Sequence, residues 1–159
     1  MTLVRVDSRL IHGQVVEAWI PFLRVKRVVV ADDEASANPL MRAAMSMALP
    51  STVHVEIHAV QDAAFSVLAQ DNIPTLLLLR DVPATWAAYE RGLPLPKLNL
   101  GNVHFALGRK QVATSVFLSE DDLQVLQSLA QRGTDIEAQS VPAERPVRFG
   151  EILERYGKA

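Results

Sequence analysis

The chain has 159 residues, a net charge of -2 at pH 7, no cysteine, and hydrophobic side chains at 49% of its positions. This length and composition are typical of one globular domain, residues 1–159, with a sizeable core. The small net charge excludes general electrostatic binding to nucleic acid or acidic membranes. The lack of cysteine excludes disulfides and thiolate metal sites.

Charged residues near the N-terminus and the length of the apolar runs bear on location. Arg5, Asp7 and Arg9 interrupt the apolar core that a signal peptide needs. The longest strongly apolar run, residues 75–79, is far too short to cross a bilayer. The sequence therefore favours a cytoplasmic location.

The first unit is a strand, a turn and a helix. Alternating apolar and polar side chains predict a strand over residues 2–7, and a helical stripe predicts a helix over residues 14–23. His12 and Gly13 then lie in the turn between them. The N-terminus of the helix presents backbone N–H groups there, which suit an anion.

Residue types around this turn suggest phosphoryl chemistry. Arg9 precedes His12 by three residues, and Asp7 precedes it by five, where it could orient a ring nitrogen or position the arginine. A nucleophilic imidazole, an arginine and backbone donors together suit phosphoryl transfer. A lone loop histidine is more often an ordinary polar residue, so the hypothesis depends on the combination.

The next segments alternate strand and helix. A β-branched run at residues 27–31 predicts a strand buried on both faces, followed by acidic residues at 32–34. A helix is expected over residues 37–49, with Pro39 in its first turn. The apolar face assigned to that helix consists of Leu40, Ala43, Ala44, Met47 and Ala48.

The middle of the chain has one half-exposed strand and one buried strand. Alternation over residues 53–57 predicts a peripheral strand, and a short helix is expected over 61–69. The apolar run at 75–79 predicts a strand at the centre of the sheet. Asp81 is expected to cap a helix over residues 83–91.

The last third begins with a short strand over residues 97–100, and a further strand is expected over 114–118. Ser119 and Asp122 have capping-box spacing and predict the start of a helix that runs to about residue 132. The remaining predicted elements are an edge strand over residues 135–141 and a final helix over 147–156.

This alternation predicts an α/β fold: an open, mainly parallel sheet of about six to seven strands with helices on both faces. Ligands of such sheets bind beyond the C-terminal ends of the strands. Four groups follow predicted strands, and we expect them to converge on one crevice: His12, Asp32–Asp33, Arg80–Asp81 and Gly101–Asn102.

Other chemistries have less support. The chain has neither a glycine-rich dinucleotide fingerprint nor a nucleotide phosphate loop, and no cofactor is expected. His54, Glu56 and His58 share a strand face that could hold a divalent metal, but a solvated face is favoured and no metal site is expected. His104 either reaches the crevice or satisfies a nearby backbone group.

The turn, Asp7-x-Arg9-Leu10-Ile11-His12-Gly13-Gln14-Val15, resembles the active-site loop of the enzyme IIB components of the mannose/sorbose family of bacterial sugar phosphotransferase systems. Residues 28–33 are similar to that family's second strand and its acidic end. Residues 99–104 are similar to its Asn-x-Gly-Gly-x-His segment. The likeness covers almost the entire chain.

The resemblance implies a phosphocarrier, that is, a protein-phosphohistidine–sugar phosphotransferase. In this family the loop histidine, here His12, accepts a phosphoryl group on Nδ1 from a phosphohistidine of the IIA component. It then passes the group to a sugar bound by the membrane IIC/IID components. Arg9 would stabilise charge and Asp7 would organise the site. The residues expected to support the phosphoryl group are Gly13, Gln14, Arg80 and Gly101.

Two positions depart from the family pattern. Asn102 replaces the second glycine of the Gly-Gly pair, and we expect the turn to survive because asparagine tolerates a left-handed backbone. Asp32 stands where the family often has asparagine, and its negative charge would need compensation by Arg9 or Arg80.

Two alternatives to the transport role stay open. One is a regulatory protein that is phosphorylated at His12 and signals through protein contacts. The other is a small-molecule-binding α/β domain without phosphotransfer. The sequence specifies neither the sugar nor the oligomeric state, and an oligomer is compatible with it.

Overall fold

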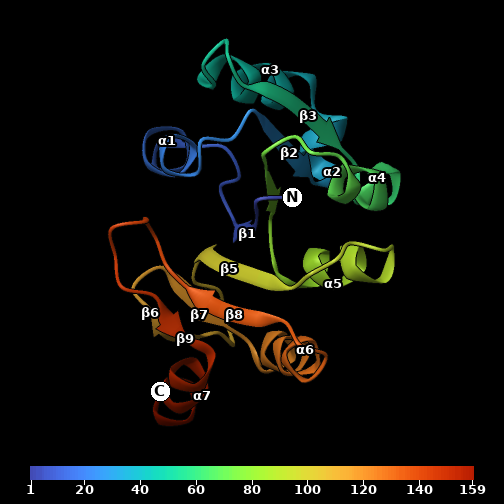
Figure 1. Ribbon diagram of the computed structural model, residues 1–159. Helices are drawn as coiled ribbons and strands as arrows, with labels where there is room; N and C mark the ends of the chain where they lie inside the picture. Colours follow the sequence, from blue (N-terminus) through green and yellow to red (C-terminus); the bar gives the residue numbers. More distant parts are fainter.

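A computed structural model describes all 159 residues as a seven-stranded sheet with a separate two-stranded hairpin (Figure 1). The strands of the large sheet follow the order β3-β2-β4-β1-β5-β8-β9. The strands are β1 (Leu3–Asp7), β2 (Arg27–Ala31), β3 (His54–His58), β4 (Thr75–Leu79), β5 (Lys97–Asn102), β6 (Lys110–Ala113), β7 (Val116–Leu118), β8 (Asp135–Ala138) and β9 (Val147–Arg148). All pairs in the sheet are parallel except β8 with β9, so the predicted α/β class and mainly parallel sheet are confirmed.

Helices cover both faces of this sheet, as the sequence predicted. They are η1 (Val15–Trp19), α1 (Ile20–Leu23), α2 (Asp33–Ala37), α3 (Pro39–Ala48), η2 (Val60–Asp62), α4 (Phe65–Gln70), α5 (Val82–Glu90), α6 (Glu120–Gln131) and α7 (Phe149–Lys158). Figure 1 shows α1 on one side of the sheet and α4 and α5 on the other. None of these helices combines the length and the hydropathy needed to span a membrane.

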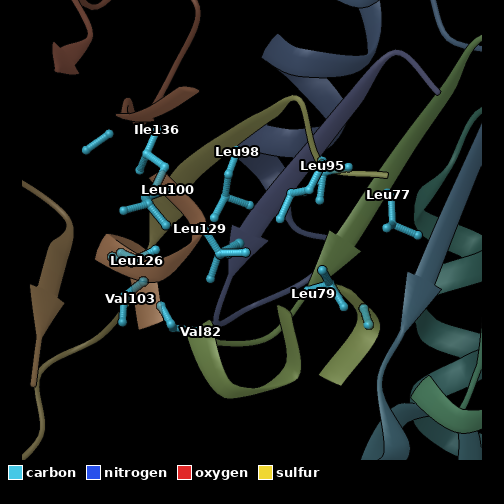
Figure 2. Packing of buried hydrophobic residues seen from close by; sticks show 14 of the residues in the cluster. Leu77, Leu79, Val82, Leu95, Leu98, Leu100, Val103, Leu126, Leu129 and Ile136 are labelled. Carbon is cyan, nitrogen blue, oxygen red and sulfur yellow. The ribbon is translucent and has the colours of Figure 1, made fainter. Parts of the chain in front are cut away.

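Two hydrophobic clusters fix the sheet between its helices. The larger contains 26 buried residues and joins β4 and β5 to α5 and α6; Figure 2 shows Leu77, Leu100, Leu126 and Leu129 within it. The smaller contains 16 buried residues on the opposite face, among them Trp19. The larger cluster includes Val6 of β1 and Leu100 of β5, so packing holds the C-terminal ends of these two strands and gives the site a firm base.

The predicted positions of the central and peripheral strands agree with the structure. β4 lies between β2 and β1 and all five of its residues are buried, while β3 forms one edge of the sheet. The predicted edge position of residues 135–141 is wrong, because β9 pairs with β8 in antiparallel orientation and takes that edge. The hairpin strand β6 was not predicted, and the two residues of β9 were assigned to the final helix.

The predicted helix over residues 37–49 is two helices with a different buried face. Asn38 is extended and caps α3, so the chain breaks between α2 and α3. Leu40 and Met47, which were assigned to the core, are 81% and 84% exposed, whereas Met45 and Leu49 are buried. Both stripes of α3 are apolar, so hydrophobic spacing alone could not decide which one faces the sheet.

The capping box predicted at the start of α6 is present. The Ser119 hydroxyl accepts a hydrogen bond from the backbone N–H of Asp122, and the Asp122 carboxylate accepts one from the backbone N–H of Ser119. We expect Ser119→Ala to lower the free energy of unfolding by about 1 kcal/mol, because two N–H groups at the helix start depend on this pair. Urea unfolding measures the change, and an unaltered midpoint would contradict it.

Candidate functional site

The end of β1 leads directly into the turn that presents His12. The backbone carbonyl of Asp7 accepts a hydrogen bond from Leu10 N–H at 3.0 Å, and its Oδ1 accepts one from Arg9 N–H at 3.0 Å. Leu10 has a left-handed backbone with φ of 58° and a buried side chain. A leucine rarely adopts this conformation, so the packing around Leu10 holds a strained turn next to His12.

Asp7 orients the imidazole of His12. The distance between His12 Nε2 and Asp7 Oδ2 is 2.8 Å, and the His12 side chain is 12% exposed while that of Asp7 is fully buried. Because an ionised carboxylate only accepts hydrogen bonds, Nε2 carries the proton in this contact. Nδ1 makes no hydrogen bond in the structure and has a free lone pair when the ring is neutral.

A bulge in β5 brings Asn102 to the same carboxylate. Val6 pairs with Leu100 and Asp7 pairs with Asn102, so Gly101 is an extra residue in β5. Asn102 Nδ2 donates to Asp7 Oδ2 at 2.9 Å and to Gln14 Oε1 at 3.2 Å. Its φ is not positive, so this position does not depend on the tolerance of asparagine for a left-handed backbone. The side chain joins the histidine network.

Hydrogen bonds and nearby positive charge hold Asp7 in its charged form. Burial of the carboxylate opposes ionisation, but hydrogen bonds from His12 and Asn102 and the charges of His12 and Arg5 outweigh it. They keep the pKa of Asp7 below its ordinary value of 3.8. The carboxylate is therefore charged throughout the neutral range and can stabilise positive charge on the His12 ring.

Arg5 is a buried member of the site that the sequence did not reveal. It is fully buried, and Nε lies 3.4 Å from Asp7 Oδ2. Its Nη groups donate to Asn99 Oδ1, to the carbonyl of Gln139 and to the carbonyl of Ser140. Burial lowers the pKa of Arg5 to about 10, although the Asp7 charge opposes this shift. The only available signal was a charged side chain in the middle of an otherwise buried strand.

Arg9, Gln14 and Gly13 lie where the turn meets solvent. Arg9 is exposed, and its Nη2 lies 3.4 Å from Gln14 Oε1. A Cβ added at Gly13 would meet nothing within 4 Å, so glycine is not required there by crowding. The backbone N–H groups of His12, Gly13 and Gln14 make no hydrogen bond within the chain. They are free to bind an anion at the start of the helix.

Two predicted support residues, Arg80 and Gly101, have other contacts. Arg80 donates from Nε and Nη2 to the two carboxylate oxygens of Asp32, at 2.8 and 2.7 Å, and contacts neither Asp7 nor His12. Arg80 therefore neutralises the negative charge of Asp32, and it is one of the two arginines that were expected to do so. A Cβ on Gly101 would overlap the Arg5 guanidinium, so this glycine makes room for the arginine.

The Asp32–Arg80 pair predicts a pH-dependent stability. Burial opposes ionisation of Asp32, but Arg80 and the backbone N–H of Ala35 keep its pKa below 3.8. The stabilisation is thus complete above pH 3.8 and is lost as pH falls through the lowered pKa. Asp32→Asn should cost about 1–3 kcal/mol at neutral pH, since asparagine keeps the helix cap but loses the charged pair.

Urea unfolding of wild type and Asp32→Asn across the acid range measures this dependence. The difference between the two proteins should shrink toward zero below pH 3.8. A difference that stays constant down to pH 2, which is well below that value, would show that the ion pair is not its source.

A hollow of about 500 Å³ opens beside the histidine turn. It is lined by Ser8, Arg9, Asn102, His104, Phe105, Ser115 and Phe117. Of the two alternatives for His104, lining the crevice agrees with the structure, since its imidazole bonds to no backbone group. Phe105 is 63% exposed and packs edge-on against Phe117, so the lining of the hollow combines two aromatic rings with the basic side chain of Arg9.

The histidines of β3 lie apart from this site on the edge strand. Each contacts Glu56: His54 Nε2 at 3.5 Å and His58 Nε2 at 3.0 Å. The His54 side chain is 69% exposed, which agrees with a solvated strand face. No group of three or more His, Cys, Asp or Glu side chains is arranged to hold a metal ion.

The sequence and the fold match a known class of proteins. The whole chain, residues 1–159, matches the family model described as PTS system sorbose subfamily IIB component. The chain belongs to this family, which confirms the resemblance noted in the sequence. IIB components of the sorbose and mannose type are phosphotransferases of the sugar phosphotransferase system.

Individual relatives match over most of the chain. It is 30% identical to the N-acetylgalactosamine-specific phosphotransferase enzyme IIB component 2 of Escherichia coli, over 96% of this chain and 98% of that protein. The mannose-specific EIIAB component of E. coli is 26% identical over 98% of this chain but only 49% of its own length. The chain therefore corresponds to about half of that relative.

Solved structures agree with the fold. The crystal structure of manxB from Thermoanaerobacter tengcongensis has a TM-score of 0.87 and 31% identity, covering 97% of this chain and 95% of that one. The IIBSor domain of the sorbose permease from Klebsiella pneumoniae has a TM-score of 0.86, covering 96% and 95%, with 22% identity. At that identity the second likeness supports the fold alone.

Proposed function

We propose that this protein is a cytoplasmic phosphocarrier in which His12 relays a phosphoryl group from a IIA phosphohistidine to a sugar bound by membrane IIC/IID components. The observation that carries the proposal is the contact between His12 Nε2 and Asp7 Oδ2, which leaves Nδ1 without a hydrogen-bond partner. Membership of the IIB family supplies the reaction class.

The first transfer needs no net proton movement. The Nδ1 lone pair of neutral His12 attacks phosphorus, the bond between phosphorus and the donor imidazole breaks, and the donor leaves with its electron pair. The His12 ring keeps its Nε2 proton and becomes positively charged, and Asp7 at 2.8 Å stabilises this charge. Arg9 and the free N–H groups at residues 12–14 support the phosphoryl oxygens.

The second transfer breaks the bond between His12 and phosphorus. A sugar hydroxyl attacks phosphorus, the Nδ1–P bond breaks, and its electron pair returns to Nδ1. The hydroxyl proton passes to solvent. Asp7 keeps the tautomer unchanged between the two steps, so the histidine is ready to accept the next phosphoryl group.

The surface around the turn suits contact with two successive partner proteins. Arg9 and Gly13 are exposed, and Phe105 and Leu107 on the neighbouring loop are 63% and 95% exposed. Apolar and basic side chains next to a reactive histidine can bury against a partner and exclude water from the transfer.

A two-stage labelling experiment tests the proposal and separates it from a regulatory role. The protein is first incubated with labelled phosphoenolpyruvate, the general phosphotransferase proteins and a IIA partner. It is then mixed with vesicles that contain IIC/IID and a panel of sugars. We expect the protein to take acid-labile label in the first stage. In the second stage this label should leave the protein as sugar phosphate. Label that forms but stays on the protein with every sugar would support the regulatory alternative, and no label would contradict both.

A further inference from the structure

We propose that Arg5 is a positioning residue that holds Asp7 so that the His12 ring keeps its proton on Nε2 and offers Nδ1 for phosphorylation. This inference rests on the proposed function for its consequence in phosphoryl transfer. Its consequence for the His12 tautomer can be observed in the resting protein. Arg5 itself makes no hydrogen bond to His12, so it would act through the carboxylate.

The contacts of Arg5 leave its guanidinium little freedom. Nη1 donates to Asn99 Oδ1 at 2.6 Å and to the carbonyl of Gln139 at 2.8 Å, and Nη2 donates to the carbonyl of Ser140 at 2.9 Å. The guanidinium carbon also lies 4.7 Å from the centre of the Trp19 ring. Strands β1 and β5, the segment after β8 and the helix after His12 are thus joined at one side chain.

The three acceptors just named are neutral, so the positive charge of Arg5 needs a counterion elsewhere. Asp7 is the only carboxylate within 4 Å of the guanidinium, with its Oδ2 3.4 Å from Nε. Both side chains are completely buried. A buried cation is stable only beside a counterion. The ion pair therefore favours the orientation of the Asp7 carboxylate in which it faces Arg5.

The same oxygen of Asp7 then meets the imidazole. Oδ2 accepts hydrogen bonds from Arg5 Nε, Asn102 Nδ2 and His12 Nε2. Oδ1 accepts one from the backbone N–H of Arg9. Rotation of the carboxylate would break several of these contacts together. Arg5 therefore fixes the direction from which the carboxylate meets the ring, and with it the ring nitrogen that bears the proton.

Gly101 offers an independent way to disturb Arg5 without removing its charge. A Cβ at this position would overlap the guanidinium, so Gly101→Ala must displace Arg5 from its place beside Asp7. The bulge that contains Gly101 also places Asn102 opposite Asp7. The need for a glycine here comes from the close approach of Arg5, since Gly101 does not have a positive φ.

The experiment compares wild type with Arg5→Met, Arg5→Lys and Gly101→Ala. Nitrogen NMR of the His12 ring reports the tautomer of the resting protein, and the initial rate of labelling by a IIA phosphodonor reports transfer. Arg27→Met is the matched control. Arg27 is also buried and paired with a carboxylate, Asp71, but it lies on β2 and contacts no residue of the histidine site.

We expect wild type to hold the Nε2-protonated tautomer. Arg5→Met and Gly101→Ala should give a mixture of tautomers, a mixture of Nδ1- and Nε2-phosphohistidine, and labelling slowed by about ten- to a hundredfold. Arg5→Lys should keep part of the rate, because lysine has the positive charge but lacks the planar set of N–H donors of the guanidinium. Arg27→Met should lose stability but keep the tautomer and the rate.

The inference is overturned if Arg5→Met is folded and keeps the wild-type tautomer and rate, or if Arg27→Met reproduces its effects. If Arg5→Met does not fold, Gly101→Ala decides, and a wild-type tautomer in that variant would overturn the inference. Failure of the wild type to take label would contradict the proposed function. The NMR result for the resting histidine would still decide the role of Arg5.

Discussion

Asp7→Asn should lower the rate of phosphoryl transfer to this protein by roughly 10²- to 10⁴-fold while leaving His12 in place. The amide is neutral and cannot stabilise the positive charge of a phosphorylated imidazole. It also has an NH₂ group that can face Nε2 and favour the wrong tautomer. An NH₂ group in the place of Oδ2 also cannot accept the hydrogen bonds that Arg5 and Asn102 donate there.

The measurement is the initial rate of labelling by a phosphorylated IIA donor, with circular dichroism to establish that the variant is folded. Asp81→Asn is the control, since Asp81 also follows a buried strand but caps α5 through the N–H of Ala84 and contacts no site residue. Asparagine is an equally good cap, so this variant should label at the wild-type rate. Equal rates for Asp7→Asn and wild type would show that Asp7 has no role in the phosphoryl transfer.

The largest expected loss of stability comes from the core of the central strand. Leu77 is fully buried in the larger cluster, and Leu77→Ala should lower the free energy of unfolding by about 2–5 kcal/mol, because it leaves a cavity between the sheet and its helices (Figure 2). Leu40→Ala removes the same atoms from a side chain that is 81% exposed and should change stability by less than about 0.5 kcal/mol.

Urea unfolding of the two variants measures both effects under the same conditions. The pair also tests which stripe of α3 faces the sheet, since hydrophobic spacing had placed Leu40 inside. A cost for Leu40→Ala similar to that for Leu77→Ala would mean that the outer stripe of α3 is covered in solution.

Much of the fold could be predicted because local patterns and tertiary burial agree. The continuous apolar run of β4 requires cover on both faces, and the half-polar pattern of β3 requires an edge; both are found. β9 has only two residues and no pattern of its own, so its pairing with β8 depends on tertiary contacts. The face of α3 was predicted wrongly since both of its stripes are apolar.

Within the candidate site, the sequence pointed to the residues proposed to carry the chemistry but not to those that hold them in place. His12, Asp7 and Arg9 are close in sequence and share one turn, so spacing was sufficient to group them. Arg5 was read as the polar half of an alternating strand, although it is buried against Trp19. Arg80 pairs with Asp32 because β2 and β4 are neighbours in the sheet. Local sequence patterns do not predict the order of strands.

The most direct test of the account is to locate the phosphoryl group. The protein has four histidines, and peptide mapping after labelling by a IIA donor distinguishes His12 from His54, His58 and His104. We expect acid-labile label on the peptide that contains His12 and none on the His12→Ala variant. Label on another histidine, or undiminished label on His12→Ala, would contradict the central claim.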